Sequence, residues 1–224
     1  MKHSTSERCG FMASLVINGG TLTAVRNVVV AVGNSAVIIQ GGELTTTGSY
    51  PTVLNRANGL LIIDKQAQII GDYANGTVSN GYLYPSTGAY ATGTIEIRGG
   101  TITAPGIAVY NEELGTINIS GGTITAGTIG VINYREGTIN VTGGNITGAW
   151  GVRNNEKAGT INVSGGTITA TEKAAVGTYK GTTTITGGNI TGATYGVYIV
   201  EGTTTITGGT LTATGGYLDT GEAA

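Results

Sequence analysis

A six-residue phrase repeats at almost constant spacing through the second half of the chain. It reads GGTITA, GGNITG or GGTLTA, and two related copies, GGTLTA and GGELTT, occur earlier, at Gly19 and Gly41. The steps between successive later copies are 22, 22, 22, 22 and 21 residues, because they start at Gly99, Gly121, Gly143, Gly165, Gly187 and Gly208. A fixed period of this length is typical of a solenoid, in which each repeat forms one coil stacked on its neighbours.

The coil from Gly115 to Gly137 indicates how each repeat is built. GTINIS and TIT alternate polar and apolar residues, which predicts two short strands with Ile117 and Ile124 facing inward. The paired glycines Gly121-Gly122 accept the positive φ of a sharp corner, and TIGVI forms a third strand anchored by Val131. NYREG then forms the last corner. We therefore predict an all-β fold, a triangular parallel β-helix with three short strands in each coil.

Other fold classes fit the pattern poorly. The 41 glycines and the many Thr, Val and Ile residues disfavour helices, and apolar residues do not recur at helical spacing. A β-sandwich also uses short strands, but it needs no fixed register of 22 residues. The period therefore favours the solenoid.

Composition excludes several classes of function. Charged residues make up 11% of the chain and the net charge is −2, which disfavours a nucleic-acid partner. His3 is the only histidine and Cys9 the only cysteine, so we expect no disulfide, no metal site and no cofactor. No apolar run reaches the length of about 20 residues that spans a bilayer, so we expect no membrane insertion.

The two ends of the chain do not resemble conventional caps. Residues 1–13 lack the apolar core of a signal peptide, and we interpret them as a leader or a partial cap. Residues 14–224 form the predicted β-helix domain. Because an uncapped solenoid exposes apolar core and strand edges, our hypothesis is that the chain is a segment of a longer protein. End-to-end self-association is a second hypothesis for the same edges.

The repeat becomes irregular between Gly41 and Gly99, where the chain contains about twelve residues more than a whole number of periods. We place this insertion near residues 73–93, which are rich in Gly, Ser, Asn and Tyr. Insertions in solenoids map to loops on one side, often the binding side. Tyr82, Tyr84 and Tyr90 are therefore candidate ligand-binding residues, whose rings suit sugar faces or a partner protein. The alternative is that these rings fold back and shield the solenoid wall.

GTINISGGTITA, with variable corners such as NEELG and NYREG, resembles the repeats of large bacterial surface proteins, especially those of gut-dwelling Gram-positive bacteria. Those repeats are similar in fold to the pectate-lyase-like β-helix, and the resemblance covers about Ser14 to Thr214. It implies a single-stranded right-handed parallel β-helix (β-solenoid) that is secreted or attached to the cell surface. It also implies an adhesin or a carbohydrate-binding stalk. The missing signal peptide and wall anchor depart from the family and again favour a segment.

An enzyme of the β-helix fold, a polysaccharide lyase or a hydrolase, is one alternative. Glycoside hydrolysis generally needs two carboxylates that flank the scissile bond. Asp64, Asp72, Glu96 and Arg98 could approach one another across coils near the insertion. The remaining acidic residues alternate with basic ones at corners, which favours a solvated ridge that keeps the solenoid soluble. We therefore predict that the chain is not an enzyme.

Outward threonine pairs suggest another alternative. Pairs such as Thr101/Thr103 and Thr123/Thr125 recur in each coil, with spacings of roughly 6.6 Å along a strand and 4.8 Å between coils. Such a lattice resembles the Thr-x-Thr faces of ice-binding β-solenoids. Threonine is equally a favourable solvent-facing strand residue, and Asn145 and Asn189 interrupt the array.

Trp150, the only tryptophan, lies between Gly148-Ala149 and Gly151, and Tyr195 is its counterpart two coils later. Either the tryptophan ring fills a corner, which we favour, or it offers an exposed platform for a sugar. Trp150 and Tyr195 thus form a second candidate site. We predict a non-enzymatic, extracellular module that binds a glycan or a host-surface partner, or that acts as a rigid stalk.

Overall fold

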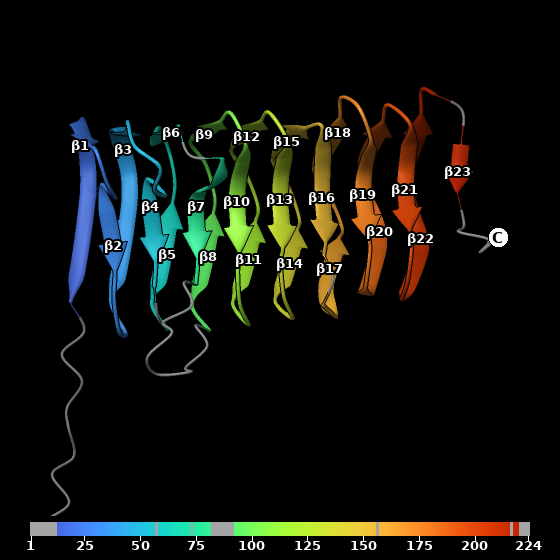
Figure 1. Ribbon diagram of the computed structural model, residues 1–224, viewed down its shortest axis with the longest axis horizontal. Coiled ribbons are helices and arrows are strands. Elements are labelled where there is room, and N and C mark those ends of the chain that lie inside the picture. Colours follow the sequence, from blue (N-terminus) through green and yellow to red (C-terminus); the bar gives the residue numbers. More distant parts are fainter. Residues whose placement is uncertain are drawn as a thin grey trace, which may run out of the picture.

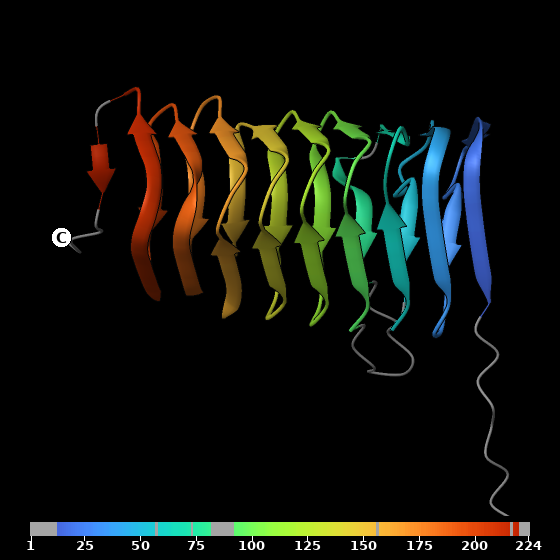
Figure 2. The ribbon, with the colours of Figure 1, turned by 180° about the vertical axis from the view of Figure 1, so that it is seen from behind.

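The computed structural model describes residues 13–56, 58–72, 74–81, 92–155, 157–215 and 217–219. These residues form 23 β-strands and no helix, and the strands stack as a solenoid of about eight turns. In Figure 1 the strands of the near side run downward, and the coils advance from β1 on the left to β23 on the right. Figure 2, from behind, shows that the strands of the opposite side run upward. This path is right-handed, and every strand pairing is parallel.

Two of the three sides of the solenoid form one 14-stranded sheet that folds around the glycine corner. The strands of the first side are β5 (Leu60–Ile63), β8 (Thr94–Ile97), β11 (Thr116–Ile119), β14 (Thr138–Val141) and β17 (Gly159–Val163). Those of the second side are β6 (Gln68–Gly71), β9 (Thr101–Ala104), β12 (Thr123–Ala126), β15 (Asn145–Gly148) and β18 (Thr167–Ala170). Four longer strands run unbroken through the corner, namely β1 (Ser14–Ala24), β3 (Ala36–Thr46), β20 (Gly181–Gly192) and β22 (Thr203–Ala213).

The third side is a separate nine-stranded sheet. Its first five strands are β2 (Val29–Ala31), β4 (Val53–Asn55), β7 (Asn75–Asn80), β10 (Ile107–Asn111) and β13 (Ile129–Asn133). The remaining four are β16 (Trp150–Asn154), β19 (Ala174–Thr178), β21 (Tyr195–Ile199) and β23 (Tyr217–Asp219). The predicted three-strand coil is confirmed, and the predicted anchor Val131 lies inward on β13, fully buried.

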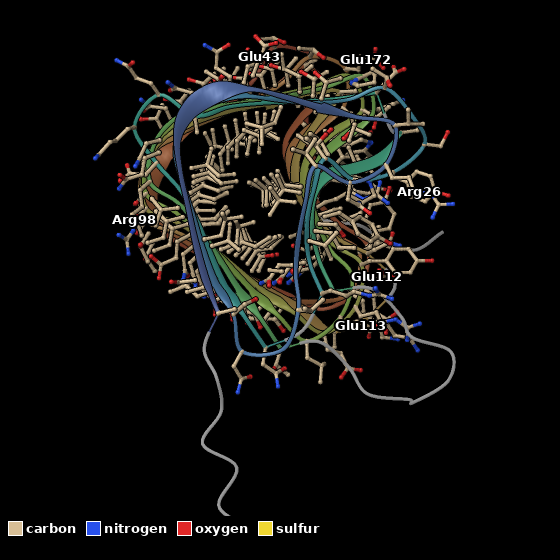
Figure 3. All side chains as sticks on the ribbon, turned by 90° about the vertical axis from the view of Figure 1, so that its left-hand side faces the viewer. Arg26, Glu43, Arg98, Glu112, Glu113 and Glu172 are labelled. Atoms are coloured by element: carbon tan, nitrogen blue, oxygen red, sulfur yellow. The ribbon has the colours of Figure 1, made fainter. Side chains whose placement is uncertain are left out.

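The core consists of identical side chains stacked along the axis. Eight valines of the third side are buried in one register ladder: Val29, Val53, Val78, Val109, Val131, Val152, Val176 and Val197. The second side contributes Ile102, Ile124, Ile146, Ile168 and Ile190. Seen along the axis, the labelled Arg26, Glu43, Arg98 and Glu172 lie outside the ring of strands (Figure 3). Burial of this apolar area is the main favourable term in folding.

A ladder of buried asparagines lies at the end of the third side. The side-chain amide of each asparagine donates to the side-chain oxygen of the next one, over 2.8–3.1 Å, from Asn55 through Asn80, Asn111 and Asn133 to Asn154. Each amide also donates to the carbonyl of a glycine four to thirteen residues later, such as Gly137 for Asn133, over 2.9 Å. The ladder thus satisfies buried polar groups at the corner, as a packed interior requires.

The paired glycines keep neighbouring coils in close contact. Gly144 has φ of +79°, and a Cβ there would lie 2.7 Å from the carbonyl oxygen of Gly121 in the preceding coil. A Cβ at Gly143 would overlap the carbonyl oxygen of Ser120, although Gly143 has no positive φ. Gly144 therefore needs glycine both for its positive φ and for the close approach of the preceding coil. Gly143 needs glycine for that close approach alone.

The structure places the surplus residues in the second half of the predicted range. The predicted range 73–93 contains β7, which pairs in register with β4 and β10 and contributes Val78 and Asn80 to the two ladders. A regular strand therefore occupies the first half of the range, because its Val-Ser-Asn sequence matches the inward positions of the third side. The surplus residues fall between β7 and β8, and residues 82–91 lie outside those that the structure describes.

Candidate functional site

The outer surface of the nine-stranded sheet differs from the other two sides. Strands of the 14-stranded sheet present mostly threonine and asparagine outward, such as Thr123 and Thr125 of β12. The nine-stranded sheet instead presents rings, aliphatic side chains and one arginine. We call this surface the aromatic face: Ile107, Tyr110, Ile129, Ile132, Tyr134, Trp150, Arg153, Tyr179, Tyr195 and Tyr198.

Alternation along the strands produces this face. In β10, Val109 and Asn111 point inward to their ladders, which turns Tyr110 outward. The next two coils place Ile132 and Arg153 at the same register position. The core does not restrict the residue type at this row, although neighbouring outward side chains do at Gly177, the next position along it. The outward positions are therefore free to carry a ligand-binding function.

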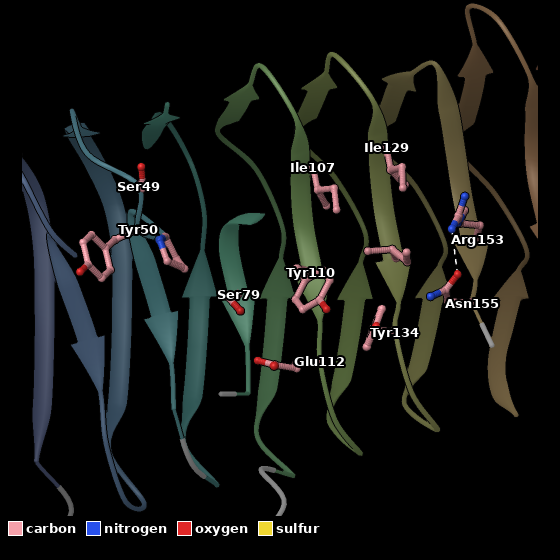
Figure 4. A pocket seen from close by; sticks show the side chains of 12 residues that line it. Ser49, Tyr50, Ser79, Ile107, Tyr110, Glu112, Ile129, Tyr134, Arg153 and Asn155 are labelled. Atoms are coloured by element: carbon pink, nitrogen blue, oxygen red, sulfur yellow. Dashed lines mark hydrogen bonds between the residues drawn. The ribbon is translucent and has the colours of Figure 1, made fainter. Parts of the chain in front are cut away.

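A groove of about 500 Å³ is hollowed into the N-terminal half of the aromatic face. Figure 4 shows Tyr50 toward β4, Tyr110 and Tyr134 in the middle, and Arg153 with Asn155 toward β16. The rings of Tyr110 and Tyr134 are tilted toward each other with centroids 5.7 Å apart, and Tyr134 is 40% exposed. The groove thus has an apolar floor and polar ends, as ligand sites commonly do.

Beyond the groove, four rings form a continuous cluster over three coils. Trp150 lies 5.8 Å from Tyr179 and 5.9 Å from Tyr198, and Tyr198 lies 5.3 Å from Tyr195, between ring centroids. Trp150 reaches Tyr198 across the intervening strand β19 because Gly177 has no side chain. A Cβ at Gly177 would lie 3.1 Å from the Trp150 ring. These separations are those of favourable aromatic pairs.

Arg153 connects the groove to the ring cluster. Its guanidinium lies 4.8 Å from the ring centroid of Tyr179 and 5.3 Å from that of Trp150, and it donates to the side-chain oxygen of Asn155 over 2.8 Å. Both rings supply cation–π attraction. Burial lowers the pKa of the guanidinium, while its charge interaction with Tyr179 raises that pKa. The cation therefore carries a desolvation cost.

The candidate residues predicted from the sequence are placed as follows. Trp150 and Tyr195 lie on the same row of the aromatic face, on β16 and β21, and both contact Tyr198. Trp150 covers Gly177 and stays half-buried, so it fills a gap in the surface and still contributes to the outer face. Tyr82, Tyr84 and Tyr90 lie outside the described residues.

Three of the four polar residues considered for catalysis, Asp64, Glu96 and Arg98, have local partners. Arg98 donates to Glu96 over 2.9 Å, as one half of an ion pair on the first side of the solenoid. Asp64 accepts a hydrogen bond from the backbone N–H of Lys65 over 2.7 Å. The threonine pairs lie in register on β9, β12, β15 and β18, and Asn145 interrupts them.

Sequence reasoning missed Tyr110, Tyr134, Arg153, Tyr179 and Tyr198. A usable signal was present, because Val-x-Asn occurs at 53–55, 78–80, 109–111, 131–133 and 152–154. The valine and asparagine are the inward ladder positions, so the residue between them is outward. Reading that middle position coil by coil would have found Tyr110 and Arg153.

Among the described residues, no group of three His, Cys, Asp or Glu side chains could hold a metal ion. The same part of the chain contains no helix of the length and hydrophobicity that crossing a membrane requires. Comparison with protein-family models, with curated proteins and with solved structures found no match to this chain.

Replacing Gly177 by valine is expected to separate Trp150 from Tyr198. The added methyl groups occupy the space in which the Trp150 ring now lies, so the ring moves outward into water. Because Trp150 is the only tryptophan, its fluorescence emission should shift to longer wavelength. Thr125→Val, on the far side of the solenoid, is the control. An unshifted emission maximum in Gly177→Val would contradict the placement of this ring.

Proposed function

We propose that this chain is a non-enzymatic, extracellular surface module that binds a glycan through the aromatic face. The observation that carries the proposal is the succession of two groups of rings on one side of the solenoid, Tyr110 with Tyr134 and Trp150 with Tyr179, Tyr195 and Tyr198, with Arg153 between them. The other two sides present mostly threonine and asparagine. Ring faces suit the apolar faces of sugars, and tyrosine hydroxyls also form hydrogen bonds.

The aromatic face extends along the solenoid axis, which suits a linear ligand. Rings and polar groups recur along the axis once per coil, about every 4.8 Å. A glycan that runs along the axis would therefore meet a new set of outward side chains with each coil it crosses. The groove supplies the depth for the first sugars, and the ring cluster extends the contact toward β21.

The carboxylates support binding rather than hydrolysis. Glu112 is the carboxylate among the described residues that line the groove, whereas hydrolysis of a glycosidic bond generally uses two. Glu113, the next residue, is buried at 1% exposure and lies 3.6 Å from Arg135, so it is not available to a ligand. Burial raises the pKa of Glu113, and the charge of Arg135 lowers it.

Trp150→Ala is expected to weaken glycan binding by about 10-fold or more, because a central ring carries a large share of an interface's binding energy. The experiment is a glycan and mucin screen of the purified chain, followed by calorimetry with the best glycan. Trp150→Phe keeps a ring and should retain part of the affinity, and Thr123→Ala, on the opposite surface, should retain all of it.

Two results would overturn the proposal. One is the absence of binding to any glycan by a chain whose circular dichroism shows a folded β-protein, which would leave the role of a rigid stalk. The other is binding that Trp150→Ala leaves unchanged. A parallel Tyr82→Ala/Tyr84→Ala variant tests the predicted insertion, and loss of binding in that variant alone would move the site there.

A further inference from the structure

We propose that Arg153 makes the end of the groove a subsite for the carboxylate of an acidic sugar, so that the preferred ligand is a glycan with a single acidic residue among neutral ones. The inference rests on the proposed function, because it names the substrate class of the same surface. It starts from the surroundings of one side chain, which Figure 4 shows at the edge of the groove.

Arg153 is held in place before any ligand arrives. Trp150 and Tyr179 lie against its guanidinium, and Asn155 accepts from Nη2 over 2.8 Å. Gly177 leaves the space in which the Trp150 ring lies, and a Cβ added to Gly177 would also be 3.2 Å from Cβ of Arg153. An arginine fixed in this way loses little freedom on binding, which makes it suited to recognise a planar carboxylate.

The charge of Arg153 has no compensating carboxylate among the described residues. Three of the other cations among the described residues do have one: Arg98 pairs with Glu96, Arg135 with Glu113, and Lys180 with Glu201. Nε of Arg153 is buried and has no hydrogen-bond partner. A half-buried cation without a counter-charge is costly, and an anion bound at the exposed edge of the guanidinium would offset that cost.

The groove favours one acidic group over many. Glu112 lines the same groove two coils before Asn155, and Tyr134 stands between them in register. A polyanion that extended along the groove would bring negative charge to Glu112, and like charges repel. A neutral sugar at Tyr110 and Tyr134 with a carboxylate at Arg153 avoids this conflict and places an apolar ring face on each tyrosine.

The experiment uses pairs of glycans that differ only in the acidic group, presented to the full chain. One pair is 3′-sialyllactose and its carboxyl-reduced form, and every other acidic glycan bound in the screen is likewise paired with its carboxyl-reduced form. The wild type is expected to prefer the acidic member by about 10-fold or more, since charge-assisted pairs of arginine and carboxylate are strong. A sulfated member and a polyanion such as heparin are included as further arms.

Arg153→Gln is expected to reduce that preference, measured as the ratio of the dissociation constants of the neutral and the acidic member, to nearly one, whatever its effect on the affinity for neutral glycans. Arg153→Lys retains the charge without the planar fork and should keep part of the preference, which separates loss of charge from loss of packing. Arg98→Gln, on another side of the solenoid, should behave as the wild type. If the sulfated glycan or heparin binds more strongly than the carboxylated glycan, the subsite prefers another anionic group and the inference is wrong.

The two proposals fail in different ways. If the wild type binds neutral glycans and shows no preference for the acidic member, this inference is wrong and the proposed function stands. If Arg153→Gln keeps the preference, the acidic subsite lies elsewhere and the assignment to Arg153 is wrong. If no glycan binds at all, the proposed function fails and this inference fails with it.

Discussion

Asn133→Ala is expected to lower the free energy of unfolding by about 2–4 kcal/mol, because it opens the buried ladder at its centre. The Asn133 amide donates to Gly137, Asn154 and Thr160, and its side-chain oxygen accepts from Asn111, all over 2.8–3.0 Å. Alanine leaves buried carbonyl oxygens without donors, and an unsatisfied buried group costs more than a hydrogen bond contributes.

Asn140 provides a matched control for Asn133. It belongs to another asparagine ladder, in which it donates to Asn118 over 2.8 Å and accepts from Asn162 over 2.9 Å. Asn140 is half-buried on the outer surface of β14, so water can replace its partners. Asn140→Ala should therefore cost about 1 kcal/mol or less.

Urea unfolding followed by circular dichroism measures both variants, with amide hydrogen exchange in β13 and its neighbours as a local readout. Exchange is needed because a solenoid can open coil by coil and depart from two-state unfolding. Equal losses in the two variants would show that the buried ladder has no special role. A loss confined to β13, with the global midpoint unchanged, would mean that coils open independently.

Gly143→Ala is expected to destabilise the chain by about 2–3 kcal/mol through overpacking between two coils. The new Cβ would overlap the carbonyl oxygen of Ser120, which belongs to the backbone and cannot turn away. Gly143 has no positive φ, so this cost is steric and not conformational. Thermal and urea unfolding measure it.

Gly19 occupies the same position of the repeat in the first coil, where an added Cβ would meet nothing within 4 Å. Gly19→Ala should therefore leave the unfolding midpoint almost unchanged. The difference in midpoint between Gly143→Ala and Gly19→Ala then measures the steric cost of the close approach between coils. Similar midpoints for Gly143→Ala and the wild type would contradict the close approach. A large loss in Gly19→Ala would show that something covers the first coil.

The inward half of each coil was predictable from the sequence because it is subject to strict local rules. Alternation identified Ile117, Ile124 and Val131 as inward, and the glycine pairs identified the corners. The predicted range of the insertion also included β7, because those rules were applied only to the repeated phrase. Val78 and Asn80 obey the rule of the third side, which the phrase does not include.

The candidate site was only partly predictable because its contacts join distant coils. Trp150 and Tyr195 were identified as unusual residues of one row, but their common neighbour Tyr198 was not. Trp150 contacts Tyr198 only because Gly177 leaves space on the strand between them. No local pattern encodes that gap, since glycine occurs both at the corners and at other strand positions, such as Gly130 and Gly151.

The sequence by itself determined the period, the parallel β-solenoid and the side chains that point inward, since a repeat of constant length imposes one coil per period. The tertiary structure alone decided which outward residues become neighbours. Stacking placed Arg153 against Tyr179, which is 26 residues away, and left its charge without a carboxylate among the described residues. The physical reason is that outward positions are unconstrained by the core, so only the register between coils brings them together.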